Sequence, residues 1–197
     1  MTTFAVHTIE SAPAASRASL ESLQKEIGFV PNLAASMAES PALVEAFTTV
    51  RAILRQSTFT PLEREVISLA VSFENDCTYC MAAHSTFAQM AGASADVLDA
   101  LRAGEVPRDR RLGALATYTR HLHANRGHLS VDAGRALLDA GFTHAQLLEA
   151  IAVIAFTTIA NYAHNITRCE VDSKFAAQRW AVSSYGVRGI GGAAPLI

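Results

Sequence analysis

Basic clusters are missing from this sequence, and charged side chains are few. Charged residues make up 17% of the 197 residues, hydrophobic residues 50%, and the formal net charge is -2. A chain without a basic stripe is a poor candidate for nucleic-acid binding. The apolar composition predicts that some surface is buried between identical subunits. The length is ample for a core of its own, and we expect residues 1–197 to form a single domain.

Long hydrophobic runs and targeting signals are also lacking. The first residues, "MTTFAVHTIESAPAAS", contain neither a basic start nor the apolar run of a signal peptide. The longest apolar stretch, residues 147–160, contains Glu149 and is shorter than the roughly 20 residues that span a bilayer. We therefore expect a buried helix there, no membrane association and a cytoplasmic protein.

Segments that alternate with period two are absent, and nearly the whole chain has helical spacing. This pattern predicts an all-α fold. Two helix starts have strong signals, because Ser40 and Thr60 are each followed by a proline, and Glu63 completes a capping box with Thr60. Gly28 is expected to end the helix over 18–28. Residues 183–197 are rich in glycine, and we expect them to be irregular.

Two parts of the chain are faintly similar at an offset of 84 residues. A pattern E-x11-C-x2-C-x3-H has a counterpart further along, and each follows a Phe-Thr pair; the matched residues are Glu65, Cys77, Cys80 and His84, then Glu149, Asn161, His164 and Arg168. A duplicated helical hairpin is one interpretation, with a first copy at about 59–92 and a second at about 142–175. Chance similarity is the alternative.

Cysteines number only three, too few for a disulfide framework, and the cytoplasm keeps thiols reduced. Two of them lie in "NDCTYC", where the helical pattern breaks. With Asn75 or Asp76 as the N-cap of a new helix, Cys77 falls in its first turn and Cys80 one turn later. The N–H groups at a helix start stabilise a thiolate, and a C-x-x-C pair is close enough to form a disulfide.

A proton acceptor and a second acid accompany the two thiols. His84 lies four residues after Cys80 on the same helical face, so it can accept the thiol proton. Glu65 belongs to the preceding helix and reaches His84 if the two helices are antiparallel, which would orient the imidazole. Together these residues make a dithiol, a base and an acid that positions the base.

Zinc binding is the main alternative, with Cys77, Cys80 and His84 as ligands and Cys169 or His164 as a fourth. Structural zinc sites usually gather two separated ligand pairs, however, and a core of this size needs no metal to fold. The redox interpretation needs no metal or cofactor. The remaining candidates are assigned plain roles: His121, His123 and His128 at the surface, His164 as a buried and hydrogen-bonded histidine, and Cys169 in packing.

The quoted pattern resembles the core motif of the AhpD-like alkylhydroperoxidases, within the carboxymuconolactone decarboxylase superfamily. The similarity rests on "EREVISLAVSFENDCTYCMAAHSTFAQMAG", on "GFVPNLAASMAESPALVEAF" before it and on "NYAHNITRCEVD" after it. It covers roughly residues 20 to 175. The motif is specific for the peroxidase-like branch, because the lactone decarboxylases lack the C-x-x-C pair.

The resemblance implies an all-α AhpD-like bundle that assembles as trimers or hexamers and a thiol-dependent peroxidase cycle. Cys80 would attack the hydroperoxide, Cys77 would resolve the product, and His84 and Glu65 would form the proton relay. The reductant would be a dithiol: a lipoyl protein, a thioredoxin-like protein or a small thiol. An acid–base reaction like that of the lactone decarboxylases, using Glu65 and His84, is the other function within the same fold.

Two features of this sequence differ from what the resemblance implies. The best-characterised members have a second histidine between the cysteines, where this chain has Tyr79, a residue that can still donate a hydrogen bond. Helix-terminus electrostatics alone favours Cys77 as the more acidic thiol, whereas the pairing with His84 favours Cys80.

Overall fold

The computed structural model describes residues 4–181, and within them every regular element is a helix. The all-α prediction is therefore confirmed, while the expected irregular tail at 183–197 lies outside the described residues. In chain order the elements are η1 (Ala14–Ser16), α1 (Arg17–Ile27), α2 (Asn32–Met37), α3 (Pro41–Leu54), α4 (Pro61–Glu74), α5 (Thr78–Met90), α6 (Ala95–Arg102), α7 (Arg110–Ala124), α8 (Val131–Asp139), α9 (His144–Thr167) and η2 (Ser173–Gln178).

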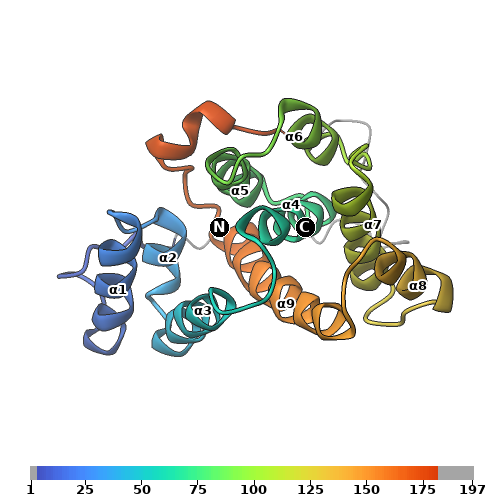
Figure 1. Cartoon of the computed structure of the whole chain (residues 1–197). Coiled ribbons are helices and arrows are strands. Elements are labelled where there is room, and N and C mark those ends of the chain that lie inside the picture. Colours follow the sequence, from blue (N-terminus) through green and yellow to red (C-terminus); the bar gives the residue numbers. More distant parts are fainter. Residues whose placement is uncertain (1–3, 182–197) are drawn as a thin grey trace, which may run out of the picture.

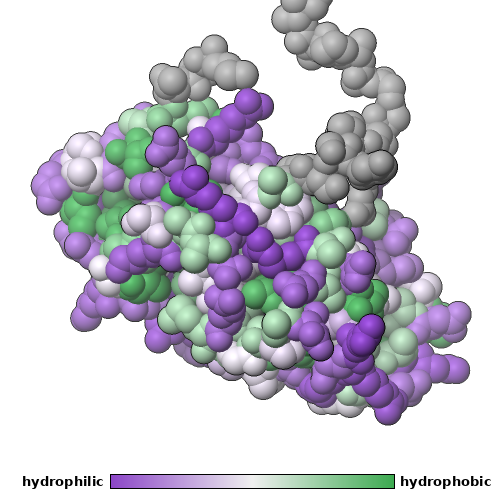
Figure 2. Space-filling model, turned by 90° about the horizontal axis from the view of Figure 1, so that it is seen from above, coloured by the Kyte–Doolittle hydropathy of each residue, from purple (hydrophilic) through white to green (hydrophobic). Residues whose placement is uncertain are grey.

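Helix α4 lies at the centre of the bundle and packs against α5, α7 and α9. Between Val66 and Val71 every residue except Ser68 is apolar and completely buried, which suits a helix covered on all sides. Helices α1–α3 lie to one side of α9, and α7 and α8 lie to the other (Figure 1). Buried apolar residues from Ala12 to Phe175 form one hydrophobic cluster. The face seen in Figure 2 is mainly polar, with apolar side chains in small patches.

Local signals in the sequence set most helix ends. Ser40 accepts a hydrogen bond from the backbone of Leu43 at the start of α3, and Gly28 ends α1 in the left-handed conformation, both as predicted. Thr60 and Glu63 form the predicted capping box at the start of α4. Thr143 and Gln146 form a second capping box at the start of α9. The two aligned helix starts therefore have the same kind of cap.

The second copy is not a hairpin, contrary to our expectation for 142–175. Residues 144–167 form one uninterrupted helix, α9. The first copy breaks at Asn75 and Asp76, whereas the aligned residues Ile159 and Ala160 include no turn-forming side chain. The helix therefore continues where the first copy turns. Among the described helices, α9 is also the one long and apolar enough to cross a membrane, but it packs centrally on α3 and α4 as a core helix does.

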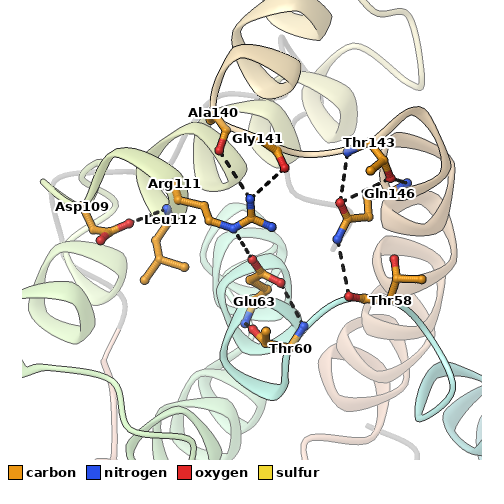
Figure 3. A network of polar contacts seen from close by, with 10 residues as sticks. All are labelled: Thr58, Thr60, Glu63, Asp109, Arg111, Leu112, Ala140, Gly141, Thr143 and Gln146. Carbon is orange, nitrogen blue, oxygen red and sulfur yellow. Dashed lines mark hydrogen bonds and ion pairs between the residues drawn. The ribbon is translucent and has the colours of Figure 1, made fainter.

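A polar network joins the starts of α4 and α9 (Figure 3). The buried carboxylate of Glu63 caps its own helix and accepts a hydrogen bond of 2.6 Å from Nε of Arg111 on α7. Arg111 also donates to the carbonyl of Gly141 and lies 3.8 Å from the ring centroid of Phe142. Gln146 donates to the carbonyl of Thr58, just before α4. Together, Glu63 and Arg111 therefore connect the start of α4, helix α7 and the segment before α9.

Replacing Glu63 tests this junction. We expect Glu63→Ala to lower the free energy of unfolding by about 3 kcal/mol, since it removes an N-terminal cap and a hydrogen bond between charged groups. Glu63→Gln should cost only about 1 kcal/mol, because an amide still caps the helix, as Gln146 does in the second copy. Urea denaturation at fixed protein concentration measures both. Equal losses in the two variants would show that the charge on Glu63 accounts for the whole effect and that an amide does not replace it.

Candidate active site

The two cysteines lie at the junction of α4 and α5, which form an antiparallel hairpin. Asp76 adopts a left-handed conformation, and the N–H groups of Asp76 and Cys77 donate to the carbonyls of Phe73 and Ser72. This is the Schellman pattern that ends a helix. Helix α5 begins directly after Cys77, so the predicted break in the helical pattern before the two cysteines is confirmed. The connection is short enough to hold both helices in fixed register.

The predicted N-cap was wrong by one or two residues. Cys77 itself is the N-cap, and its Sγ accepts a hydrogen bond of 3.4 Å from the backbone N–H of Cys80. Asn75 cannot serve because it is the C-cap of α4, with its side chain bonded to Asn161 and His123. Asp76 is held in the left-handed turn. The start of α5 therefore directs a backbone N–H at the sulfur of Cys77, where it stabilises negative charge.

Both thiols of the pair are buried and free, but only one of them faces a cavity. Cys80 is 2% exposed and lines a cavity of about 50 Å³, together with His84. Cys77 is fully buried and does not line this cavity. A small molecule in the cavity therefore meets the sulfur of Cys80 and not that of Cys77.

Burial raises the pKa of the Cys80 thiol well above its ordinary value, and the neighbouring Cys77 raises it further. A hydrogen bond with the side chain of Asn161 acts in the opposite direction. A buried thiol of this kind is a weak nucleophile at neutral pH unless a base takes its proton during the reaction. The site therefore requires a proton acceptor close to Cys80.

His84 and Glu65 are in contact, as the sequence predicted. Nδ1 of His84 and Oε2 of Glu65 are 2.7 Å apart, and the side chains are 12% and 19% exposed. This hydrogen bond fixes the ring and leaves Nε2 for proton exchange. Within residues 4–181 no direct hydrogen bond joins His84 to Cys80, although both line the same cavity. Proton transfer between the thiol and the imidazole would therefore pass through a bridging water or the substrate itself.

The cavity next to Cys80 is almost entirely apolar. Helices α1, α3, α5 and α9 and the turn η2 contribute its walls, which include Leu23, Phe47, Phe87, Phe156 and Phe175. Its volume of about 50 Å³ accommodates a few water molecules or a small organic group. Apolar walls with few polar groups are typical of sites for small organic ligands.

Tyr79 does not take part in the relay. Its hydroxyl donates a hydrogen bond of 2.5 Å to Asp172, which also accepts from the backbone N–H of Asn32. Burial and the contact with Asp172 raise the pKa of Tyr79, so the phenol stays neutral. Tyr79 therefore fastens α5 to the segment before η2, and its ring forms part of the cavity wall.

Polar side chains of α9, in the second copy of the repeat, form a row of hydrogen bonds with polar side chains at the end of α4. Thr157 donates to Ser68, Asn161 donates to Ser72, and Asn75 donates to Asn161. The sequence pattern alone does not mark Asn161 as a residue that contacts the thiols. Its alignment with Cys77 in the repeat was the available signal.

The other histidines and the third cysteine have structural positions. His164 is buried and lies 3.2 Å from Oγ1 of Thr78, as predicted for a satisfied histidine, and burial lowers its pKa. Cys169 is buried beside it, and burial raises the pKa of this thiol to about 11. His123 is not a plain surface residue, because it contacts Asn75 at 3.0 Å. No group of three His, Cys, Asp or Glu side chains in residues 4–181 is arranged to hold a metal ion, so the zinc hypothesis has no support there.

Comparisons with known proteins agree with this geometry. Residues 41–116, which include both thiols, Glu65 and His84, match the model of the carboxymuconolactone decarboxylase family. An uncharacterized peroxidase-related protein with the alkylhydroperoxidase AhpD core, from Ralstonia eutropha JMP134, has a TM-score of 0.76 at 24% identity, over 87% of this chain and 93% of that one. Residues 41–116 are therefore similar to the carboxymuconolactone decarboxylase family, and the fold of the chain is similar to that of an AhpD-like protein.

Two further structures extend the AhpD-like fold comparison. A peroxidase-related protein from Silicibacter sp. TM1040 is 21% identical over 90% of this chain and 94% of that one, with a TM-score of 0.74. The C82A variant of the debrominase Bmp8, in complex with 2,3,4-tribromopyrrole, is 16% identical over 90% and 96% of the two chains, with a TM-score of 0.73. The comparison with curated proteins finds no match. At these low identities the comparison shows that this chain has the same fold as the AhpD-like neighbours, and it shows no more than the fold.

Proposed function

We propose that this AhpD-like protein is a thiol-dependent peroxidase that reduces hydroperoxides through a Cys77–Cys80 disulfide. The observation that supports it most is the position of Cys80, which lines the apolar cavity beside His84 while Cys77 is buried behind it. The family is generally enzymatic, and two structural neighbours are described as peroxidase-related.

The cycle has three balanced steps. The Cys80 thiolate attacks one oxygen of ROOH, the O–O bond breaks, and Cys80 becomes a sulfenic acid while the leaving RO⁻ takes a proton and departs as ROH. The Cys77 thiol then displaces the sulfenic hydroxyl, which leaves as water, and the disulfide forms. An external dithiol finally reduces this disulfide and becomes a disulfide itself. A lipoyl protein, a thioredoxin-like protein or a small thiol can fill that role.

Peroxide consumption that depends on a dithiol tests the proposal. We expect turnover of hydrogen peroxide or an organic hydroperoxide only when a lipoyl, thioredoxin or glutathione donor is present. Mild peroxide without donor should lower the intact mass by two hydrogens. Cys77→Ser should abolish this mass loss and leave the product one oxygen heavier, because the sulfenic acid then has no partner.

A Cys77→Ser variant that still loses two hydrogens would contradict the assigned resolving thiol. Cys169→Ser is the matched control, since Cys169 is a buried thiol outside the pair. It should behave as the wild-type protein does.

An acid–base reaction without thiol chemistry is the competing function. The contact between Glu65 and His84 favours it, because this pair would serve equally as a general base. Activity on a lactone or similar carbon acid that survives replacement of both Cys77 and Cys80 would establish it and displace the peroxidase.

Assembly into a homo-oligomer, as trimers or hexamers, belongs to the same proposal. Several large apolar side chains on α9 are exposed at helical spacing: Leu148, Ile151, Tyr162 and Ile166. A contiguous exposed apolar strip is typical of a protein interface. The cytoplasmic location likewise stays a prediction, in line with reduced thiols.

A further inference from the structure

A second, polar cavity lies next to the apolar one. Its volume is about 120 Å³, and it shares Arg51, His84 and Phe156 with the cavity that contains Cys80. Arg55, Arg64 and Glu65 also line it. His84 and Arg51 therefore line both the apolar cavity at the thiol and the charged cavity next to it.

Positive charge is in excess around this second cavity. Three arginines line it, and the carboxylates that contact this group of residues are Glu26 and Glu65. Glu26 holds both Arg51 and Arg55, at 3.1 and 3.3 Å, and Glu65 is bonded to His84. Three guanidinium charges thus face two carboxylates, and within residues 4–181 Arg64 has no carboxylate partner. Such a cavity attracts an anion.

Arg51 has the donor that such an anion needs. Its Nη2 contacts Glu26, yet the side chain is 25% exposed and lines both cavities, so its guanidinium can be reached by a ligand. A carboxylate is the group that a guanidinium binds best.

We propose, on the basis of the peroxidase function above, that the substrate is a small organic hydroperoxide that carries a carboxylate. Its apolar body occupies the space lined by Phe47, Phe87 and Phe156, its O–O bond lies at Cys80, and its carboxylate accepts from the guanidinium of Arg51. Because His84 lines both cavities, it can protonate the RO⁻ that leaves while Arg51 holds the distant end of the same molecule.

The kinetic test compares two hydroperoxides of similar size, one neutral and one with a carboxylate. We expect the carboxylate form to have the higher kcat/KM. In Arg51→Met the ratio of the two kcat/KM values should fall about tenfold, through KM, because one ion pair with the substrate is lost. Arg135→Met is the matched control: Arg135 is exposed on α8 and lines neither cavity, so the ratio should stay as in the wild type.

A binding test separates this inference from the peroxidase function. Titration of the Cys80→Ser variant with benzoate in a calorimeter should show saturable binding that is absent with benzyl alcohol and lost when Arg51→Met is added. Equal kcat/KM for both hydroperoxides, together with no benzoate binding, would overturn the inference and leave the peroxidase intact. Benzoate binding in a protein that consumes no peroxide would overturn the peroxidase and keep the anion site. Binding of chloride or phosphate as tight as that of benzoate would show a site for any anion and contradict the organic substrate.

Discussion

Cys80→Ser should lower peroxide turnover by about three orders of magnitude, as expected when an enzyme loses its nucleophile. The serine hydroxyl is far less acidic than a thiol, so the same base cannot convert it to a useful nucleophile. The small change in volume leaves the apolar cavity in place. Dithiol-dependent consumption of hydroperoxide measures the loss, and circular dichroism verifies that α5 is still formed.

The comparison with Cys77→Ser decides which thiol reacts first. Cys77→Ser should still react once with peroxide, in a single turnover followed by stopped flow, because Cys80 remains. The opposite pattern, a burst in Cys80→Ser and none in Cys77→Ser, would mean that the hydrogen bond from the helix start to Cys77 matters more than the position of Cys80 in the cavity.

The α4–α5 hairpin and the contact between Glu65 and His84 were predictable because their signals are local. Thr60 and Glu63 mark the start of one helix, and the polar residues before Cys77 mark the break. Once the two helices are antiparallel, the spacing brings Glu65 to His84. The N-cap was wrong because Asn75 and Asp76 are equally good capping residues in isolation. Tertiary contacts of Asn75 with Asn161 and His123 decide otherwise.

The cavities were not predictable, because they arise where distant segments meet. Arg51 on α3 comes next to His84 on α5 only through the packing of α3 on α9. The partner of Tyr79 is 93 residues away, in Asp172. Neither contact leaves a periodic pattern in the sequence. The motif therefore predicts the reacting groups, while the fold determines which substrate can approach them.

His84→Ala should lower kcat/KM for hydroperoxide by about two orders of magnitude at pH 7, the usual contribution of a general base. The pH dependence gives the sharper result. Since burial raises the pKa of Cys80, the thiolate fraction in the variant is small at neutral pH and grows about tenfold per pH unit until that pKa is reached. The variant should therefore recover activity steadily between pH 7 and pH 9, whereas the wild-type rate should change much less.

Glu65→Gln completes the test of the relay. The amide keeps the hydrogen bond to Nδ1 of His84 but removes the charge that stabilises the imidazolium, so we expect a loss of about tenfold with the wild-type pH profile largely kept. A His84→Ala variant whose rate stays parallel to the wild type from pH 6 to pH 9 would mean that His84 does not accept the Cys80 proton. The hydrogen bond with Asn161 would then be what favours the Cys80 thiolate, and the contact of His84 with Glu65 would serve only to position α5 against α4.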